Sequence, residues 1–585
     1  MYTIGISCYY HDASAALLKD GIIVAAAEEE RFTRKKHDSS FPKNAIMFCL
    51  DSEKISSSDI DYVGFYEKPL LKFERLMHQH LESFPNSLKV FLSSTPSWLT
   101  EKLRIAARLR KEIKYDKEII YVNHHLAHAA SAFLPSPFER AAIVTVDGVG
   151  EWATTTYGIG NKNNINIQKE IVFPHSIGLL YSTITAYLGF SVNNSEYKVM
   201  GLAAYGDMNP STNRYYSKLK KVIDIRPDGS FRLEMEYFKF HYSSRMPSKK
   251  LCELLGGDIR KNEPVSNRHK DIAAALQLIA EETLTNMLLN VHKDTKEDNL
   301  VMAGGVALNS VFNGKILRKT PFKKIWVQPN ASDGGASIGA AMYVHNSILK
   351  HKREYVMDNA FLGPSFNDEN IRNFLIHNRI RFSEFENDMQ LVKKTARLIY
   401  ENKVIGWFQG RMEWGPRALG ARSILSNACN KDMKELLNKK VKHREIFRPF
   451  APAVCYDDAP KYFDCDDPIP DPCDFMLMVY PIKKQWQEKL PAVTHVDGSG
   501  RLQTVKKSQN ILYYEVIKEF GKLSKIPIII NTSFNIRGEP IVCSPKDAYK
   551  CMMGTGIDAT VMGKFLVQRK DNLKDRWNSE NIAKD

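Results

Sequence analysis

The first thirty residues constrain the fold most, because they read as three short strands in a row. Residues 3–7 alternate as a strand does, and the apolar stretches ASAALL (13–18) and IIVAAA (22–27) are separated by Lys19-Asp20-Gly21. An Asp-Gly pair between two apolar runs is a strong signal for a tight hairpin turn. We therefore expect the chain to open on an antiparallel β-meander.

Further along the chain, predicted strands alternate with predicted helices. The strands are expected at residues 60–66, 118–123, 141–148, 153–160 and 299–305, and a long helix with apolar residues at helical spacing is expected at 271–294. Alternation of this kind, with glycine turns after two of the strands, predicts an α/β domain of roughly 350 residues. Such a domain is large enough to consist of two similar halves.

Length and composition limit the remaining possibilities. With 585 residues the chain is too long for one small binding module, and a charged, lysine-rich stretch leads us to place a domain boundary near residue 352. Nine cysteines without a Cys-x-x-Cys pair, no signal-peptide pattern and no long apolar run predict a reduced, cytoplasmic protein without a membrane span. The net charge of +15 fits polyanionic partners or a lysine-rich surface about equally well.

The strongest chemical signal is a pair of histidines four residues apart. His124 and His128 follow a predicted strand, and on a helix their imidazoles would share one face, which suits chelation of one metal ion. Asp147 and Asp333 each stand at the end of a predicted strand beside glycines, where both carboxylates could face the same cleft. Two His and two Asp ligands suit Fe(II), Mn or Zn. A pair of surface or capping histidines is the competing interpretation.

Two glycine turns could also accept a nucleotide. Gly148 and Val149 follow Asp147, and Gly304-Gly305 leads toward Asn309 at the start of a predicted helix, a position that favours anions. Near the N-terminus, a neutral His11 in a strand-end loop could accept a proton from a hydroxyl group. Lys36, within a basic run, could neutralise phosphate charge, although such runs are usually solvated.

The C-terminal part of the chain carries its own basic cluster. Cations are interleaved with turn-forming residues in GRMEWGPRALG (410–420), VKHREIFRPF (441–450), HVDGSGRLQTV (495–505) and NTSFNIRGEPIV (531–542). Because guanidinium groups match phosphate and carboxyl groups with paired hydrogen bonds, this pattern favours a pocket for small anions. It does not resemble a nucleic-acid-binding stripe.

Taken together, these motifs resemble those of a known enzyme family. The segments YHDASAALL, EEERFTRKKHD, VNHHLAHAASAF, TVDGVGEW, EYKVMGLAAYG, GGVALN, SDGGASIGAA, GRMEWGPRALGARSIL, REIFRPFAPAV, HVDGSGRLQTV and NTSFNIRGEPIV are similar, in order, to motifs of NodU/CmcH-type O-carbamoyltransferases. The resemblance implies an actin-like (ASKHA) duplicated domain over residues 1–352 and a YrdC-like α/β domain over residues 353–585. One position differs from the family pattern, since Ala204 stands where Pro is common.

The resemblance also implies a reaction and roles for residues. Carbamoyl phosphate and ATP, with Mg²⁺, would give carbamoyl-adenylate in the second domain, and the carbamoyl group would pass to a hydroxyl of a small-molecule or sugar acceptor in the first, as in natural-product or antibiotic biosynthesis. His11 would be the general base. The metal, Fe(II) or another divalent ion, would be held by His124, His128, Asp147 and Asp333. Nucleotide contacts in the first domain would come from Lys36, Asp147, Gly148, Val149, Gly304, Gly305 and Asn309. Carbamoyl phosphate and ATP would be bound in the second domain by Arg417, Lys442, Arg501 and Arg537.

Two other functions remain open on the sequence. A threonylcarbamoyl transferase that modifies tRNA would fit the basic charge, but no basic amphipathic stripe supports it. A non-catalytic nucleotide-binding regulator of the actin/Hsp70 type would not need the four ligands and His11. We expect neither a nucleic-acid partner nor a membrane span, and a homodimer is the default expectation for the oligomeric state.

Overall fold

The chain folds into two compact units. The computed structural model describes residues 1–445 and 447–572. The first unit comprises Met1–Glu29 and Ser39–Met357, and the second comprises Glu30–Asp38 together with the chain from Asp358 onward. The division after Met357 lies five residues beyond the predicted boundary, because the connecting residues pack on the first unit. Arg353 donates to the carbonyl of Phe138 at 2.6 Å, and the Met357 N–H donates to the carbonyl of Pro135 at 2.9 Å.

The short segment Glu30–Asp38 belongs to the second unit although it follows the N-terminal strands directly. It contains helix α1 (Glu30–Thr33), and Arg31 donates to the carbonyl of Gly415 at 3.0 Å. Arg34 donates to the carbonyls of Pro540 and Ile541, each at 2.7 Å. Lys36, which the family resemblance assigns to the nucleotide site of the first domain, therefore lies in the second unit.

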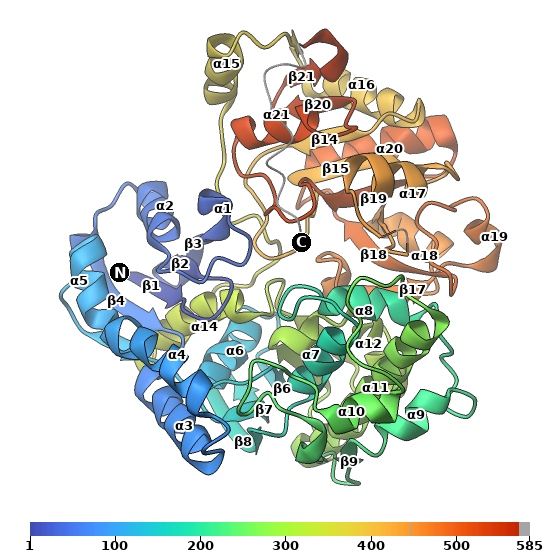
Figure 1. Cartoon of the computed structure of the whole chain (residues 1–585). Helices are drawn as coiled ribbons and strands as arrows, with labels where there is room; N and C mark the ends of the chain where they lie inside the picture. The colour runs from blue at the N-terminus through green and yellow to red at the C-terminus, as the bar shows by residue number, and fades with distance from the viewer. Residues whose placement is uncertain (446, 573–585) are drawn as a thin grey trace. The chain divides into compact units, whose positions relative to one another are not determined.

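Two five-stranded sheets form the framework of the first unit (Figure 1). The first sheet has the order β3-β2-β1-β4-β5, with strands β1 (Tyr2–Ser7), β2 (Ser14–Lys19), β3 (Ile22–Glu28), β4 (Ile60–Phe65) and β5 (Ile119–Tyr121). The second has the order β8-β7-β6-β11-β12, with strands β6 (Arg140–Val146), β7 (Ala153–Asn161), β8 (Asn164–Val172), β11 (Asn299–Ala303) and β12 (Lys324–Val327).

The two sheets have the same topology. In each sheet, three antiparallel strands form a meander. The first strand of the meander also pairs in parallel with a fourth strand, and that strand pairs in parallel with a fifth. The predicted hairpin turn is present, since Asp20 and Gly21 both have positive φ (50° and 85°), as a two-residue hairpin turn requires. The prediction of an actin-like duplicated α/β domain is thereby confirmed.

Two helices rich in small residues, α6 (His124–Phe133) and α14 (Ala336–Met342), pack against each other and against the sheets. Three glycines permit the close approach. A Cβ on Gly339 of α14 would lie 1.8 Å from the carbonyl oxygen of Ala127, and one on Gly5 of β1 would lie 1.8 Å from that of Ser337. A Cβ on Gly64 of β4 would lie 2.8 Å from the carbonyl oxygen of Ala340. This tight packing brings the N-terminal ends of α6 and α14 together.

The other helices of the first unit cover the two sheets and their connections. They are α2 (Lys43–Glu53), α3 (Pro69–Glu82), α4 (Leu88–Thr100), α5 (Ile105–Ile113), α7 (Ile177–Tyr187), α8 (Glu196–Ala203), α9 (Arg214–Leu219), α10 (Lys249–Leu255), α11 (Asn267–Thr295), α12 (Ser310–Asn313) and α13 (Ile316–Lys319), with a small hairpin of β9 (Ile223–Ile225) and β10 (Phe231–Leu233). Helix α11 is long and apolar enough to cross a membrane, but 72% of its apolar window is buried inside the protein, as expected of a core helix.

The second unit is built on a nine-stranded mixed sheet of order β13-β21-β20-β14-β15-β19-β16-β18-β17. Its strands are β13 (Ser383–Glu384), β14 (Ile405–Phe408), β15 (Arg422–Asn427), β16 (Ala451–Cys455), β17 (Met478–Pro481), β18 (Ser499–Val505), β19 (Ile528–Ser533), β20 (Ala559–Met562) and β21 (Phe565–Gln568). Its helices are α15 (Asp368–His377), α16 (Asp388–Tyr400), α17 (Met433–Leu436), α18 (Ala459–Tyr462), α19 (Lys484–Gln487), α20 (Ile511–Ser524) and α21 (Pro545–Met553). The predicted α/β class of this part is confirmed.

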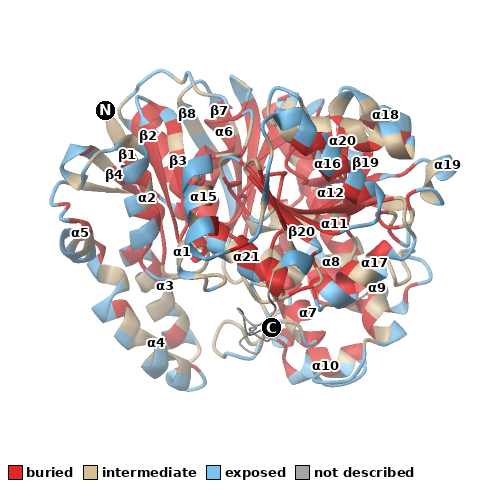
Figure 2. Ribbon diagram, turned by 90° about the horizontal axis from the view of Figure 1, so that it is seen from above, coloured by how far each residue is buried: buried red, intermediate tan, exposed pale blue. Residues whose placement is uncertain are grey.

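The core of the second unit lies between its sheet and two amphipathic helices. Helices α16 and α20 pack on each other and bury a continuous apolar cluster that includes Trp407, Tyr513 and Phe520. Figure 2 shows the central strands of this sheet as buried along their length. The loops at the strand ends, which carry the basic motifs, are thus attached to a rigid framework.

Candidate metal centre and surrounding residues

Helix α6 brings the two predicted histidine ligands together. The helix begins at His124, so His124 and His128 stand one turn apart on one face, and they are 1% and 0% exposed. The backbone N–H of His124 donates to both carboxylate oxygens of Glu151, at 3.0 and 3.1 Å. A buried carboxylate thereby holds the first turn of the helix, where negative charge is favourable.

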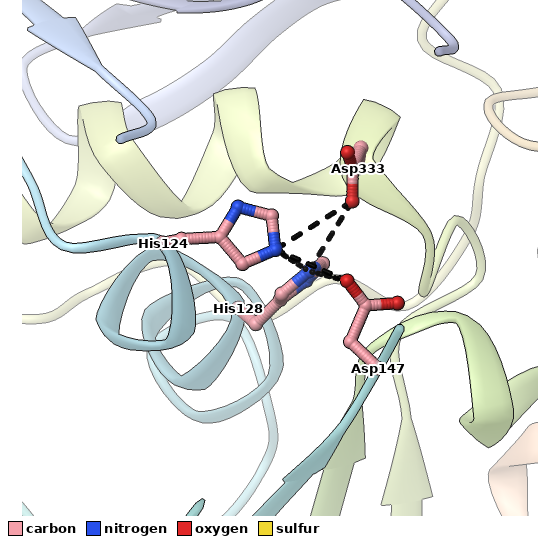
Figure 3. A group of neighbouring side chains, drawn as sticks. All are labelled: His124, His128, Asp147 and Asp333. Carbon is pink, nitrogen blue, oxygen red and sulfur yellow. Dashed lines mark hydrogen bonds and ion pairs between the residues drawn. The ribbon is translucent and has the colours of Figure 1, made fainter. Parts of the chain in front are cut away.

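The two predicted aspartates face this pair of histidines, as Figure 3 shows. Asp147 follows β6, and its Oδ2 lies 3.1 Å from Nε2 of His124 and 3.7 Å from Nε2 of His128. Asp333 precedes α14, and its Oδ1 lies 3.7 and 3.6 Å from the same two nitrogens. The two Nε2 atoms lie 3.1 Å from each other.

The geometry of these four residues fits a divalent metal ion. One ligand atom from each lies within 4.8 Å of all the others. Ligands at about 2.1 Å from a tetrahedral ion would lie roughly 3.4 Å apart, close to the spacings observed. Both Asp333 oxygens are buried without a hydrogen bond among the described residues, which is costly unless a cation accepts them. Imidazole and carboxylate donors without thiolate suit Fe(II), Mn or Zn.

Two histidines of α6, His128 and His125, have pKa values shifted in opposite directions. Burial would lower the pKa of His128, but Asp147 and Asp333 outweigh it and raise that pKa to about 9. Burial opposes ionisation of Asp147 as well, yet the two histidines hold its pKa well below the usual range. Burial and the two neighbouring histidines lower the pKa of His125 to about 3, and its Nδ1 lies 2.6 Å from Oγ1 of Thr145. The ring of His125 therefore contacts Thr145 instead of joining the group of four.

The glycine turn after β11 supports Asp147 directly. The N–H of Gly305 donates to Oδ1 of Asp147 at 2.9 Å. Gly304 has a φ of 92°, and a Cβ there would lie 2.2 Å from the carbonyl oxygen of Val146, so only glycine fits. Gly305, predicted to approach a nucleotide, thus uses its N–H to orient a metal-ligand candidate.

The other predicted nucleotide contacts also have partners within the first unit. The Gly148 carbonyl accepts a hydrogen bond from Ser176 at 2.8 Å, and Val149 is 9% exposed. The side chain of Asn309 caps α12 and exchanges two hydrogen bonds with Gln277, at 3.1 and 3.2 Å. These residues stay candidates for nucleotide binding. Their hydrogen bonds with Ser176 and Gln277 fix the conformation of the loops in which they lie.

His11 is connected to the metal-ligand candidates through two intermediate side chains. Its Nδ1 lies 2.9 Å from Oδ2 of Asp12, which accepts a hydrogen bond from Ser332, the residue before Asp333, at 3.3 Å. Burial would lower the pKa of His11, but the charges of Asp12 and Asp333 prevail and raise it to about 10. Beside the charged Asp12 and Asp333 the imidazole is therefore protonated at neutral pH, unlike the neutral base expected from the sequence.

In the second unit, Lys442 is the most deeply buried of the predicted cations. It is 3% exposed, and its Nζ donates to the carbonyl and side chain of both Ser533 and Asn535. Burial and the nearby charges of Arg444, Arg448 and Lys36 hold the pKa of Lys442 well below its usual range. Lys36 therefore lies near the basic cluster of the second unit.

The remaining predicted cations occupy the loops of the same unit. Arg417 and Arg501 are half-buried. Arg537 lies 3.9 Å from Glu445 and 3.4 Å from the carbonyl of His443. Guanidinium groups in these loops are suited by their chemistry to bind phosphate or carboxylate groups.

Two residues of the segment GRMEWGPRALGARSIL have structural roles that sequence reasoning missed. Glu413 accepts hydrogen bonds from the N–H groups of Leu419, Ala421 and Arg422 at 2.6–2.9 Å. Arg422 is fully buried, donates to four carbonyl oxygens and lies over the ring of Phe408 at 3.7 Å. Their spacing in the sequence does not reveal this, because the partners are backbone groups brought together by the turn.

A concave site in the second unit is lined by none of the predicted cations themselves. It has an empty volume of about 280 Å³ and is lined by residues of 359–361, 474–475 and 503–510. Its polar wall includes the carboxylate of Asp474, which pairs with Lys506 at 2.8 Å. An acidic wall does not favour carbamoyl phosphate, so this site is a weaker candidate for that substrate than the basic loops.

Comparison with known proteins identifies the class to which this fold and site belong. The family model described as carbamoyltransferase N-terminus matches residues 2–342, and that described as carbamoyltransferase C-terminus matches residues 396–569. The chain belongs to the carbamoyltransferase family and is a carbamoyltransferase enzyme.

Relatives resemble the chain over nearly its whole length. An uncharacterized protein of Synechocystis sp., sll1178, is 42% identical and covers 99% of both chains. The nodulation protein NolNO of Sinorhizobium fredii is 35% identical over 97% of this chain and 80% of its own length. Among solved structures, HypF of T. kodakarensis matches 60% of this chain and 48% of its own, with 13% identity and a TM-score of 0.32, which is too low to support an argument.

Proposed function

We propose that the protein is an ATP-dependent O-carbamoyltransferase that works in two half-reactions. In the second unit, water would release phosphate from carbamoyl phosphate to give carbamate, and a carbamate oxygen would attack the α-phosphorus of ATP to give carbamoyl-adenylate and release pyrophosphate. In the first unit, the carbamoyl group would be transferred to an acceptor hydroxyl, releasing AMP. The observation that carries the proposal is the buried group His124, His128, Asp147 and Asp333, with His11 beside it, in a chain of the carbamoyltransferase family.

The chain's own residues have distinct tasks in this scheme. His124, His128, Asp147 and Asp333 would hold Fe(II) or another divalent ion, which when bound supplies Lewis-acid stabilisation of negative charge. Asp12 orients the imidazole of His11 through their 2.9 Å contact. His11 would take the proton of the acceptor hydroxyl from its other ring nitrogen, Nε2, while the oxygen attacks the carbamoyl carbon.

The charges of the site determine when His11 can act as a base. A protonated imidazole cannot accept a proton, and the charges of Asp333 and Asp147 contribute to holding it protonated. A divalent cation among the four ligands offsets these two negative charges, so the pKa of His11 would fall toward the neutral range. Metal binding and base catalysis are thereby coupled by electrostatics.

In the second unit, the basic loops would bind the anionic substrates. Arg417, Arg501 and Arg537 offer guanidinium groups to phosphate oxygens, and Lys442 orders the turn from Ser533 to Asn535 that precedes Arg537. Lys36 contributes charge to the same unit. Mg²⁺ would accompany ATP.

The test is carbamoyl-phosphate-dependent exchange of labelled pyrophosphate into ATP by the purified, metal-loaded protein. We expect exchange that requires carbamoyl phosphate but no acceptor, and a carbamoyl-adenylate detectable by mass spectrometry. His11→Ala should keep the exchange and lose transfer to acceptors, and exposed His377→Ala in α15 is the matched control. Absence of both exchange and adenylate would refute the proposal.

A further inference from the structure

Exposed apolar side chains gather on one helical hairpin of the first unit. Of the nineteen large apolar residues that are exposed in the described part of the chain, seven lie between residues 70 and 99. They are six leucines and Phe84, and they belong to helices α3 and α4 and the turn between them. Single exposed leucines are normal on a folded protein, whereas a local concentration of them marks a surface that contacts something else.

The inner face of α4 packs on α3. The ring centroids of Trp98 and Phe73 lie 5.9 Å apart, and those of Phe91 and His80 lie 5.3 Å apart. Trp98 is buried. These contacts join the two helices into one hairpin and determine which side of α4 faces outward.

The outer face of α4 is apolar. Leu88, Leu92 and Leu99 are 44%, 63% and 55% exposed, and their spacing of four and seven residues places them on one side of the helix. Figure 2 shows α4 at the edge of the first unit, mainly in the colours of exposed and intermediate residues. The helix contains no Asp or Glu. An apolar stripe without acidic neighbours therefore faces solvent.

The polar side chains of α4 do not require water for their donors. Each of its five hydroxyl groups donates to a backbone carbonyl of the same helix, at 2.7–3.4 Å, and these groups belong to Ser93, Ser94, Thr95, Ser97 and Thr100. A donor that is satisfied within its own helix can enter an apolar environment at low cost. The helix can thus lie against lipid without leaving these donors unpaired.

The surroundings of the stripe are strongly basic. Residues 69–114, from the start of α3 to the residue that ends α5, contain nine Lys and Arg but four Asp and Glu, so they carry a third of the net charge of +15. Arg104, Arg110, Lys111 and Lys114 follow α4 closely in the chain and are exposed. A second copy of the chain related by a two-fold axis would bring two such basic segments together, whereas an anionic surface would attract them.

We propose that the outer face of α4, with the basic residues that follow it, docks the protein on the surface of an anionic lipid bilayer. The leucines would enter the boundary between headgroups and acyl chains, and the cations would lie among the lipid phosphates. Protein interfaces are enriched in Tyr, Trp and Met, whereas six of the seven exposed apolar residues here are leucines. Docking of this kind does not depend on the proposed reaction and involves no helix that spans the membrane.

The experiment is co-sedimentation of the full-length protein with vesicles of phosphatidylcholine alone, or of phosphatidylcholine and phosphatidylglycerol in equal parts. We expect binding to the anionic vesicles that weakens as salt is raised, and little binding to the neutral ones. A variant that combines Leu88→Ser, Leu92→Ser and Leu99→Ser should raise Kd for the anionic vesicles at least about tenfold. Its Tm should stay unchanged, because the three side chains are exposed.

Two further variants separate the apolar stripe from surface apolarity in general and from charge. The matched control replaces three apolar residues that are 42–48% exposed elsewhere in the first unit and should bind like the wild type: Leu289→Ser, Ile348→Ser and Val356→Ser. A variant that combines Arg104→Gln, Arg110→Gln and Lys111→Gln should lose the preference for anionic vesicles. This charge variant keeps the proposal testable if the leucine variant does not fold.

Hydrogen exchange locates the contact. Anionic vesicles should slow exchange of backbone amides in α4 and α5 and leave those of α10 unchanged. No binding by the wild type, equal binding to both kinds of vesicle, or unchanged affinity in the leucine variant would overturn the proposal. A wild-type dimer that the leucine substitutions convert to a monomer in sedimentation velocity would also overturn it, because a second copy would then cover this face.

Discussion

Metal binding by the four buried ligands should depend steeply on pH, because a proton must leave His128 first. Asp147 and Asp333 raise the pKa of His128 to about 9, and only the neutral imidazole can coordinate a metal. At pH 7 the neutral form is about 1% of the total, which weakens apparent affinity about 100-fold relative to the fully neutral imidazole and costs about 3 kcal/mol. Affinity should therefore rise about tenfold per pH unit up to about pH 8 and level off above pH 9.

The stability of the metal-free protein should change in the opposite direction. The folded-state pKa of His128 is raised above its ordinary value of 6.5, so its protonation stabilises the fold fully below pH 6.5. That contribution is lost as the pH rises from 6.5 to about 9, and it amounts to at most about 3 kcal/mol. The rise in Tm on adding metal should consequently grow over the same range.

Calorimetric titration with Mn²⁺ between pH 6 and 8.5 measures both affinity and proton release, when repeated in buffers of different ionisation enthalpy. We expect about one proton released per ion near pH 7. Asp333→Asn should weaken binding and flatten the pH dependence, because one of the charges that raise the pKa of His128 is removed. Exposed Asp298→Asn, whose carboxylate pairs with Lys323 at 2.9 Å, is the control. Affinity independent of pH in the wild type would contradict the reasoning.

Three further predictions concern the groups that support the site. His11→Gln should slow transfer to an acceptor by about 10²–10⁴-fold while pyrophosphate exchange persists, and equal loss of both rates would oppose a role as base. Gly304→Ala should lower Tm by the equivalent of roughly 1–3 kcal/mol and weaken metal binding, because the new Cβ would meet the Val146 carbonyl. Gly148→Ala is the control, because a Cβ has room at that position, and it should change neither Tm nor metal affinity. Glu151→Gln removes the negative charge of the carboxylate that accepts from the His124 N–H, and it should weaken metal binding about tenfold in the same titration. Unchanged affinity would show that the start of α6 needs no carboxylate.

The ligand quartet could be predicted because each member belongs to a local pattern. Two histidines four residues apart on a helix, and aspartates at strand ends beside glycines, indicate where the side chains point as well as which ligand types they offer. The hairpin with positive φ at Asp20 and Gly21 was predictable for the same reason. In each of these cases, the residues that decide the geometry lie within a few positions of one another in the chain.

Other features depend on contacts between distant parts of the chain. Nothing near Arg34 predicts that it donates to the carbonyls of Pro540 and Ile541, about five hundred residues away, or that Lys36 accompanies it into the second unit. The raised pKa of His11 is only partly readable from the sequence, because Asp12 is its neighbour in the chain whereas Asp333, which also raises it, is distant in sequence. Backbone acceptors, such as the carbonyls around Arg422, likewise leave no sequence pattern.

The same distinction explains why the reaction was easier to infer than the acceptor. Chemistry at the carbamoyl group needs a fixed set of residue types, and these appear as recognisable motifs. Selection of an acceptor needs only side chains of suitable shape and charge near His11, and no local motif has to mark them. Such side chains come together through contacts between distant parts of the chain, as Asp12 and Ser332 do beside His11.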